Sequence, residues 1–460
     1  IMDNINLNNI RNKKVLVVGL GKSGIAAVQA MLKLGASVTV QDSKDIDKID
    51  GQLLSFLKGK GVDFYLGEVP EDLSRFDMLI LSPGVDPELP FIREAEQSGA
   101  EIIGELEIAF RIARGRFVAI TGTNGKTTTT TLTGEIFKKA GRPTHVVGNI
   151  GVAVISKALD TETEDWLITE TSSFQLQTIK YFKPVISAIL NVTPDHLNRH
   201  HTMENYGLTK GRVFENQDES GYCILNADDE TCRKLAENCP AETVFFSSSR
   251  ELEKGAFVKD GMLVIADREG NVIELCRQDE LNIIGRHNVE NALAAAAISY
   301  YAGIEPQVIR EVLKSFNGVA HRIEYCGTLD GVKFYNDSKG TNVDATLTAL
   351  RAIEKNIILI AGGDGKSQDF SPLAENLKGR VKHLVLIGRD GPEIAEAADK
   401  AGYKDYTYGS DMGDCVNKAF DIAEEGDTIL LSPACASWDM YDNFEQRGDH
   451  FKEMVKNLGI

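Results

Sequence analysis

The feature that most constrains this chain is a unit that recurs along it: a short β-branched run, a turn that contains glycine, and a stretch with helical spacing. Helices that alternate with buried strands are typical of βαβ crossovers, which join parallel strands. We therefore predict an α/β protein with doubly wound parallel sheets. The predicted buried strands are residues 14–19, 37–41, 78–81, 117–121, 166–169, 186–191, 356–361, 381–388 and 428–431.

The unit restarts twice along the 460 residues, and at about 100–200 residues per domain this indicates three domains. A strand and a glycine-rich loop begin again at Arg116, after a predicted helix at residues 105–114, and a further set of strands begins at Arg322. Residues 256–276 differ, because apolar and polar residues alternate there between turns, which predicts antiparallel hairpins. We place the domains at residues 1–104, 105–318 and 319–460.

Charge and composition limit the classes of partner. Lys and Arg number 50 and Asp and Glu 68, so the formal net charge is −18. An acidic surface repels phosphate backbones and anionic headgroups, so we expect neither nucleic acid nor a membrane surface as a partner. No apolar run approaches the roughly 20 residues that cross a bilayer, and the first residues lack the pattern of a signal peptide. The seven cysteines never form a CxxC pair, so we expect reduced, packed thiols in a cytoplasmic protein.

Residues 122–128 (GTNGKTT) follow an apolar strand and begin a threonine-rich helix. In this context backbone N–H groups and a helix N-terminus bind polyphosphate. Lys126 is expected on the β- and γ-phosphates and the Thr127 hydroxyl on Mg²⁺. The loop departs from the standard pattern, because Ile120 stands where the first glycine is expected. A glycine-rich turn with an exposed lysine is the alternative, but strand, loop and helix together favour nucleotide binding.

Residues 19–24 (GLGKSG) also connect a strand to a helix, and Asp42 ends the next strand. This is the form of a dinucleotide fingerprint, in which the turn and the helix N-terminus bind a pyrophosphate. Taken alone, the pattern favours NAD and an oxidoreductase, but it does not specify which pyrophosphate binds. A tight turn without a ligand is the structural alternative. Lys22 and Ser23 add a cation and a hydroxyl, and residues 82–84 (SPG) form another turn at a strand end.

Other strand ends carry polar residues as well. Glu170 follows the strand 166–169, where an acid is either the second ligand of Mg²⁺ or the cap of the next helix. His196 ends the run NVTPDH and is either a ligand of metal or phosphate or a structural histidine. Three turns farther along are either plain turns or sites for an anion: 336–342 (NDSKGTN), 362–366 (GGDGK) and 432–438 (SPACASW).

In order along the chain, these motifs resemble those of the Mur ligase family, ATP-dependent amide-forming enzymes that build the peptidoglycan precursor. The resemblance covers essentially the whole chain. It implies three α/β domains: a Rossmann-like UDP-binding domain, a P-loop-type ATP-binding central domain and a dinucleotide-binding-like C-terminal domain. The matching motifs are GTNGKTT, GNIG (148–151), ETSSFQL (170–176), NVTPDHL (191–197), GRHNVENALAA (285–295), HR (321–322), NDSKGTN, GGDGK and residues 430–451.

The resemblance implies a ligase that adds D-glutamate to UDP-N-acetylmuramoyl-L-alanine through an acyl phosphate and releases ADP and phosphate. Its partners would then be those two substrates and ATP, with Mg²⁺ at two sites. We expect a monomer in the cytoplasm. Two competing hypotheses are kept: an NAD- or nucleotide-sugar-dependent oxidoreductase that uses GLGKSG, and a regulatory module that binds ATP without catalysis.

The resemblance also implies residue roles. UDP-substrate binding is expected at Gly21, Lys22, Ser23, Asp42, Ser43, Ser82 and Asn149. ATP binding is expected at Gly122, Thr123, Asn124, Gly125, Lys126, Thr127, Thr128, Asn288, Asn291, Arg322 and Asp337. D-Glutamate binding is expected at Thr341, Lys366, Ser437 and Phe444.

Metal and catalytic roles come from the same resemblance. Thr127 and Glu170 match one Mg²⁺ site, and His196 and Lys210 match a second, where the family lysine is carbamylated. The expected catalytic residues are Lys126, His196, Lys210 and Lys339. From its own sequence context (YGLTKGRVFE), Lys210 is predicted to be a surface lysine of a helix.

Overall fold

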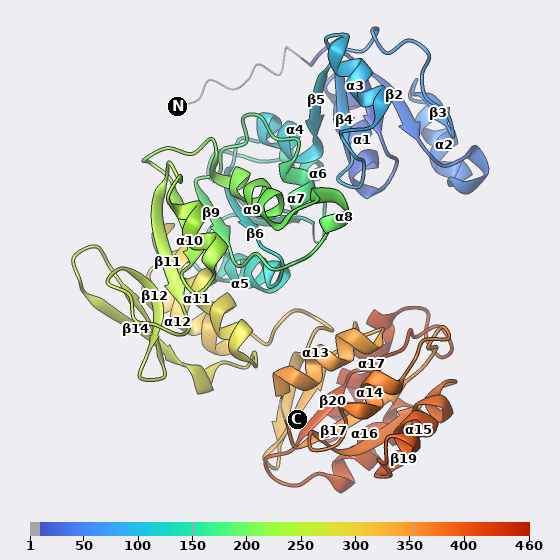
Figure 1. The fold of residues 1–460 in the computed structure, drawn as a ribbon, viewed down its shortest axis with the longest axis vertical. Coiled ribbons are helices and arrows are strands. Elements are labelled where there is room, and N and C mark those ends of the chain that lie inside the picture. The colour runs from blue at the N-terminus through green and yellow to red at the C-terminus, as the bar shows by residue number, and fades with distance from the viewer. Residues whose placement is uncertain (1–9, 150, 354) are drawn as a thin grey trace. The chain divides into compact units, whose positions relative to one another are not determined.

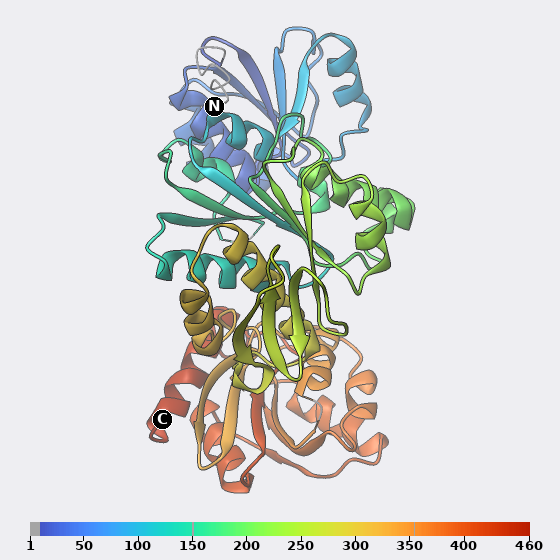
Figure 2. The same cartoon turned by 90° about the vertical axis from the view of Figure 1, so that its left-hand side faces the viewer.

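The computed structural model describes residues 10–149, 151–353 and 355–460 (Figures 1 and 2). The N-terminal segment 1–9 and Ile150 of the GNIG motif lie outside the described residues. The chain forms two compact units, one with Ile1–Leu275 and Glu290–Val312 and the other with Cys276–Val289 and Leu313–Ile460. No helix among the described residues is both long and apolar enough to cross a membrane.

The first sheet contains β1 (Lys14–Val18), β2 (Ser37–Asp42), β3 (Asp63–Leu66), β4 (Met78–Leu81) and β5 (Glu101–Gly104). The strand order is β3-β2-β1-β4-β5, and every neighbouring pair is parallel. β1 and β4 are almost fully buried, as expected for central strands of a sheet covered on both faces. The accompanying helices are α1 (Lys22–Lys33), α2 (Gly51–Lys58) and α3 (Pro90–Gln97).

The second sheet contains β6 (Arg116–Thr121), β7 (Thr144–Gly148), β8 (Trp166–Glu170), β9 (Ile186–Ile189), β10 (Tyr222–Asn226), β11 (Glu242–Ser247), β12 (Gly255–Lys259), β13 (Met262–Ala266) and β14 (Val272–Arg277). Its order is β14-β13-β12-β11-β10-β9-β6-β8-β7. Neighbouring strands are parallel from β7 to β12. β12 and β13 form an antiparallel hairpin that turns at Asp260 and Gly261, both with positive φ, which confirms the predicted hairpin.

The helices that follow these strands are α4 (Glu105–Ile112), α5 (Lys126–Lys139), α6 (Val154–Ala158), α7 (Ser173–Leu176), α8 (Leu197–His200), α9 (Met203–Gly211), α10 (Glu230–Ala236), α11 (Arg286–Tyr301) and α12 (Pro306–Ser315). One apolar cluster contains buried side chains from both of the first two sheets, such as Val17 of β1 and Ala119 of β6. The first two sheets therefore belong to one packed unit.

The third sheet contains β15 (Glu324–Leu329), β16 (Val332–Asn336), β17 (Ile357–Gly362), β18 (Val381–Ile387), β19 (Tyr406–Tyr408) and β20 (Thr428–Leu431). Its order is β15-β16-β20-β17-β18-β19, and only β15 is antiparallel to its neighbour. One apolar cluster packs α13 (Val343–Ile353), α14 (Ser371–Glu375) and α15 (Gly391–Lys400) against the sheet, and a separate one packs α16 (Met412–Ile422) and α17 (Phe444–Asn457) (Figure 1). The predicted doubly wound arrangement is confirmed.

The strands that the sequence analysis missed include those at the edges of the three sheets. β3, β7, β15 and β19 each end a sheet, and most of their residues are only half-buried. An edge strand carries polar side chains on its open side, so it lacks the continuous apolar run that marks a buried parallel strand. Most central strands carry such a run and were predicted, but β10 and β11, which lie inside the second sheet, were missed as well.

A buried carboxylate anchors α4, the helix that connects the first sheet to the second. Glu107 is fully buried, and its side chain accepts hydrogen bonds from the backbone N–H groups of Lys180, Tyr181 and Phe182. It also pairs with Arg111 at 2.7 Å, and Arg111 in turn forms a bidentate pair with Glu101 of β5. These pairs of Glu107, Arg111 and Glu101 therefore fix the connection between the sheets.

Glu107→Ala should lower the free energy of unfolding by about 3–5 kcal/mol, because it removes one of the two carboxylates that pair with the buried Arg111 and leaves three backbone N–H groups without their acceptor. Urea denaturation followed by circular dichroism measures the change. Glu101→Ala is the matched control, since Arg111 keeps Glu107, and it should cost about 1 kcal/mol or less. Equal losses of unfolding free energy in the two variants would contradict this account of how α4 is held between the sheets.

Candidate active site

The glycine-rich loop between β6 and α5 has the geometry of a phosphate-binding turn. Gly125 caps α5 with a left-handed φ of 82°, and a Cβ there would lie 2.2 Å from Asn291 Oδ1 of α11. The N–H groups of Thr123 and Asn124 donate to the side-chain oxygen of Asn191, at 3.1 and 2.9 Å. These contacts hold the loop on two sides. The N-terminus of α5 follows the loop directly, and a helix N-terminus stabilises a bound anion.

Lys126 lies over this loop. Its ammonium group donates to the carbonyl oxygens of Gly122 and Thr123, at 2.9 and 2.8 Å. Carbonyl oxygens are weaker acceptors for a cation than phosphate oxygens, so an entering polyphosphate can replace them. The loop thus holds a positive charge at the start of α5, where the sequence predicts the β- and γ-phosphates.

A hydroxyl and a carboxylate meet beside the loop. Thr127 Oγ1 lies 3.0 Å from Glu170 Oε2, at the end of β8, and the other oxygen of Glu170 accepts from Asn149 Nδ2 at 3.0 Å. Glu170 does not cap the next helix, because Ser172 forms the capping box of α7. Hydroxyl and carboxylate oxygens at one point suit Mg²⁺, which prefers hard oxygen ligands. The structure therefore fits the predicted ligand pair Thr127 and Glu170.

The prediction that Lys210 is a surface lysine is wrong. Its side chain is 1% exposed, and its amine donates to the Gly122 carbonyl oxygen at 2.8 Å and lies over the Tyr206 ring. Burial, assisted by the nearby charge of Lys126, lowers the pKa of Lys210 to about 7. The chain around it (YGLTKG) has no clear apolar stripe, so helical periodicity did not reveal that this face of α9 is turned inward.

Two histidines lie near this lysine in different environments. His196 begins α8 with a left-handed φ of 52°, and its ring is half-exposed against Phe174. His200 is buried, and its Nε2 lies 3.0 Å from Ser173 Oγ. Burial, then the charges of Arg199 and Lys210, lower the pKa of His200 to about 4, so it is neutral at physiological pH. No sequence pattern marked His200 as part of this region.

No group of three or more His, Cys, Asp or Glu side chains that could hold a metal occurs within the described residues. The residues expected to hold a metal at this site are of mixed type. The candidates are Thr127, Glu170, His196 and a modified Lys210. A hydroxyl, a carboxylate, an imidazole and a carbamate are each able to bind Mg²⁺ through oxygen or nitrogen.

The predicted UDP residues of the first sheet lie at the ends of three neighbouring strands, β1, β2 and β4. Asp42 accepts from the backbone N–H groups of Leu20 and Lys44, at 2.6 and 2.9 Å, and Ser82 Oγ donates to the Gly19 carbonyl at 3.0 Å. Gly21, Lys22 and Ser43 are exposed there, and Ser23 is half-buried. Asn149 lies instead beside Glu170, on the second sheet.

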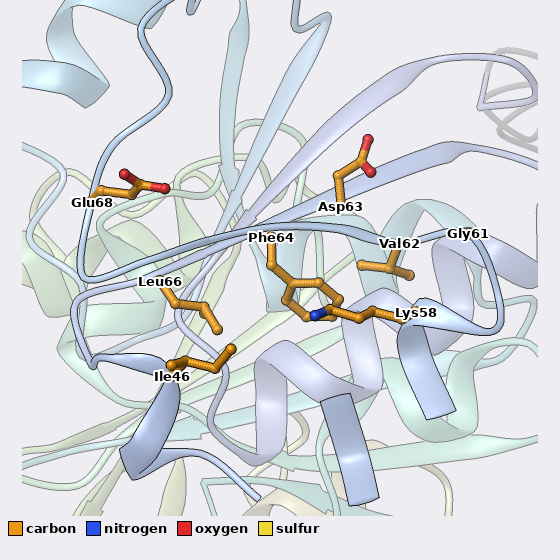
Figure 3. Close-up of a pocket in the computed structure, with 8 residues that line it drawn as sticks. All are labelled: Ile46, Lys58, Gly61, Val62, Asp63, Phe64, Leu66 and Glu68. Carbon is orange, nitrogen blue, oxygen red and sulfur yellow. The ribbon is translucent and has the colours of Figure 1, made fainter. Parts of the chain in front are cut away.

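An open pocket of about 560 Å³ also lies in the first domain, beside the edge strand β3 (Figure 3). Phe64 and Leu66 of β3 form its apolar part, and Lys58, Asp63 and Glu68 add charges. No residue predicted to bind a substrate lines this pocket. It nevertheless borders one of the strand ends that carry the predicted UDP site, because Leu66 pairs with Asp42 across β3 and β2.

The third sheet gathers its predicted residues at the ends of β16, β17 and β20. Asp337 is buried, and Ser432 Oγ donates to it at 2.6 Å; burial raises the pKa of Asp337 to about 7. Lys339 is exposed, with its amine 5.8 Å from the centre of the Phe444 ring. Lys366 has a left-handed φ of 51° and lies 4.0 Å over the Trp438 ring. Ser437 is buried, Thr341 half-buried and Arg322 exposed.

The two asparagines of the GRHNVENALAA motif have separate partners. Asn291 Oδ1 accepts from Thr129 Oγ1 of α5 at 3.2 Å, next to the phosphate loop. Asn288 Nδ2 donates to the Ile284 carbonyl oxygen at 2.7 Å, within the second unit. The structure thus brings Asn291 to the loop.

Sequence reasoning also missed Arg447 of α17. It is 3% exposed and donates to Ser338 Oγ and to the carbonyl oxygens of Ser338 and Cys435, at 2.9 to 3.0 Å. Burial lowers its pKa to about 10. Arg447 thus ties together two of the turns that carry predicted D-glutamate ligands. Its context, EQRG, has no feature that distinguishes it from a surface arginine of a helix.

Comparison with known proteins supplies the family. Three domain descriptions match: the N-terminal domain of D-glutamate-ligase-like Mur ligases over residues 13–104, the Mur ligase middle domain over 120–299 and the Mur ligase glutamate ligase domain over 321–435. A UDP-N-acetylmuramoylalanine–D-glutamate ligase of Alkaliphilus oremlandii is 48% identical over 98% of this chain and 99% of its own length. The ligase of that name in Clostridioides difficile is 46% identical over 98% and 100%.

Solved structures share the fold. The UDP-N-acetylmuramate–alanine ligase of Thermotoga maritima aligns over 97% of this chain and 100% of its own, with a TM-score of 0.55 and 18% identity. That similarity concerns the three-domain architecture alone, whereas the relatives with nearly half of their residues identical establish the family. The chain therefore belongs to the Mur ligase family.

Proposed function

We propose that this chain is the ATP-dependent ligase that joins D-glutamate to UDP-N-acetylmuramoyl-L-alanine, a step in the synthesis of the peptidoglycan precursor. The observation that carries the proposal is 48% identity over 98% of the chain to a relative with that name. The phosphate loop with Lys126, Thr127 and Glu170 supplies the ATP chemistry that such a ligase needs. The oxidoreductase hypothesis is not favoured, because the GLGKSG turn itself lies inside the matching Mur ligase N-terminal domain.

Each domain would then have one substrate. The first, residues 1–104, would bind the UDP end of the sugar substrate, and the second, residues 105–318, would bind ATP. The third, residues 319–460, would bind D-glutamate. Each domain has predicted residues at or next to a carboxyl end of a strand, where open α/β sheets bind ligands: Asp42, Glu170 and Asp337. Lys210, Asn291 and Phe444 lie on helices instead.

The reaction has two steps that conserve charge and atoms. The L-alanyl carboxylate attacks the γ-phosphorus of ATP, which gives an acyl phosphate and releases ADP. The uncharged amine of D-glutamate then attacks the acyl carbon, an amide forms, and phosphate leaves with a proton released from the nitrogen. Lys126 stabilises the negative charge that two anions bring together in the first step. Mg²⁺ bound by Thr127 and Glu170 would neutralise further phosphate charge.

We infer that Lys210 carries a carbamate and, with His196, serves a second Mg²⁺ site. A carbamate forms when an uncharged amine attacks CO₂ and loses a proton. Burial supports this role, because the pKa of Lys210 near 7 leaves a large fraction of the amine uncharged at neutral pH, and that fraction increases as the pH rises. The carbamate also replaces a buried cation with an anion next to Lys126, which removes a repulsion.

We further propose a cytoplasmic monomer. ATP and UDP-linked precursors are cytoplasmic compounds, and the seven cysteines are all free thiols.

The proposed activity is tested by phosphate release with ATP, Mg²⁺ and UDP-N-acetylmuramoyl-L-alanine, scanned over D- and L-amino acids. We expect release that depends on D-glutamate and is absent with L-glutamate. An absorbance change from NAD(H), or ATP binding without amino-acid-dependent release, would contradict the proposal.

Lys126→Ala should reduce phosphate release by about 100-fold or more, because one preorganised cation is lost where charge develops. Lys138→Ala changes an exposed lysine at the other end of the same helix and should leave the rate unchanged. Steady-state phosphate release measures both variants. A Lys126→Ala enzyme of near-normal rate would exclude the phosphate-loop role.

Lys210→Ala should be inactive, and short carboxylates such as acetate or propionate should restore part of the activity, because they supply the oxygen ligand that the carbamate provides. Lys234→Ala on α10, an exposed lysine paired with Glu230, is the control and should neither lose activity nor respond to carboxylates. An active Lys210→Ala enzyme would remove the proposed carbamate.

A further inference from the structure

Arg199 joins the predicted UDP-binding turn of the first sheet to the catalytic region of the second. It lies on α8, three residues after His196. Its guanidinium group donates to three successive carbonyl oxygens of the turn that follows β4. The acceptors are Pro83 and Gly84, at 3.5 and 3.3 Å from Nη1, and Val85, at 2.8 Å from Nη2. This turn begins with Ser82, which is predicted to contact the UDP substrate.

The other side of the same guanidinium is fixed to the second domain. Nε and Nη2 both donate to Gln177 Oε1, at 3.0 and 2.7 Å, and the guanidinium lies 4.7 Å over the Phe174 ring, next to His196. Its five hydrogen bonds all go to neutral oxygens, and burial lowers its pKa, with Asp86 as the one nearby charge that opposes the shift. A planar group held on both edges and on one face has little freedom to move.

We propose that Arg199 is a positioning residue that fixes the distance between the UDP-binding turn and the site of phosphoryl transfer. The inference rests on the proposed function, because this distance affects the rate only for a substrate that reaches both sites. Its UDP end would lie at the turn after β4, and its alanyl carboxylate at the phosphate loop beside β6. Arg199 connects the turn after β4 to Gln177 and to the Phe174 ring, which in turn contacts His196.

The physical reason is preorganisation. A long substrate held at one end delivers its carboxylate to the γ-phosphate only if the two sites keep the right separation, and a shift of about 1 Å far from the chemistry can cost about 100-fold in rate. Arg199 holds three carbonyl groups with one rigid fork, which a lysine cannot do. Loss of the fork should thus impair the linked substrate while each end group still binds.

The test compares the Arg199→Ala and Arg199→Lys enzymes with the unsubstituted enzyme. In Arg199→Ala, kcat/KM for UDP-N-acetylmuramoyl-L-alanine should fall about tenfold or more. The Kd values of UDP alone and of ATP alone, measured by calorimetry, should change less than about twofold, because neither ligand reaches both the UDP-binding turn and the site of phosphoryl transfer. Arg199→Lys should recover part of the loss, since an ammonium group still reaches one or two of the carbonyls.

Arg212→Ala is the matched control. Arg212 is also half-buried and donates to carbonyl oxygens, those of Gln177 and Ile179, but these contacts stay inside the second domain. Its loss should lower thermal stability without a selective effect on the UDP-linked substrate. An equal effect of the two variants, or weaker binding of UDP or ATP alone in Arg199→Ala, would overturn the positioning role.

Hydrogen exchange separates this inference from the proposed function. Amides of residues 82–89 should exchange faster in Arg199→Ala, whereas those of β1 should not. Wild-type enzyme without D-glutamate-dependent phosphate release would refute the proposed function, and the exchange result would still decide whether Arg199 fixes the turn. Unchanged exchange at residues 82–89 would refute the inference even in an active enzyme.

Discussion

A single carbonyl oxygen organises the nucleotide site. Gly122 O accepts from the ammonium groups of both Lys126 and Lys210, at 2.9 and 2.8 Å. Two cations on one acceptor repel each other, and burial disfavours the charged form of an amine. Lys210 is the more buried of the two, and burial, together with the charge of Lys126, lowers its pKa to about 7. The carbonyl group of the glycine that shapes the loop therefore binds a lysine whose amine loses its proton readily.

This arrangement reconciles the acidic chain with anionic ligands. The net charge of −18 describes the surface as a whole, whereas Lys126 sits at the start of a helix and beside a second lysine. Both features raise the local positive potential where phosphates are expected. A carbamate on Lys210 would invert one of these charges and create a place for a cation. The same few atoms can thereby serve phosphate and Mg²⁺ in neighbouring positions.

Much of this site could be predicted from the sequence, because its parts follow a rule of local order. A buried strand, a glycine turn and a helix are adjacent in the chain, so GTNGKTT was found from its context. Context left Glu170 open between a Mg²⁺ ligand and a helix cap, and the structure brings it to Thr127. Other side chains owe their position to contacts between segments far apart in sequence, and their burial could not be predicted from local context. They are Lys210, His200, Arg199 and Arg447. No local pattern distinguishes a buried lysine or arginine of a short helix from an exposed one. The edge strands were missed for a similar reason. Their side chains are less buried because no strand lies on one side of them, and local sequence does not show this.

The cations whose buried contacts the sequence did not reveal all donate hydrogen bonds to backbone carbonyl groups. Arg199, Arg447 and Lys210 all donate to carbonyl oxygens of glycine-containing or strand-ending turns. Turns at the carboxyl edge of a parallel sheet leave such oxygens without partners in the sheet, and a buried carbonyl without a donor is costly. A cationic side chain satisfies several at once and fixes the turn in place. The loops that meet substrates can therefore be rigid without regular structure, and the rigidity comes from distant helices that supply one charged side chain each.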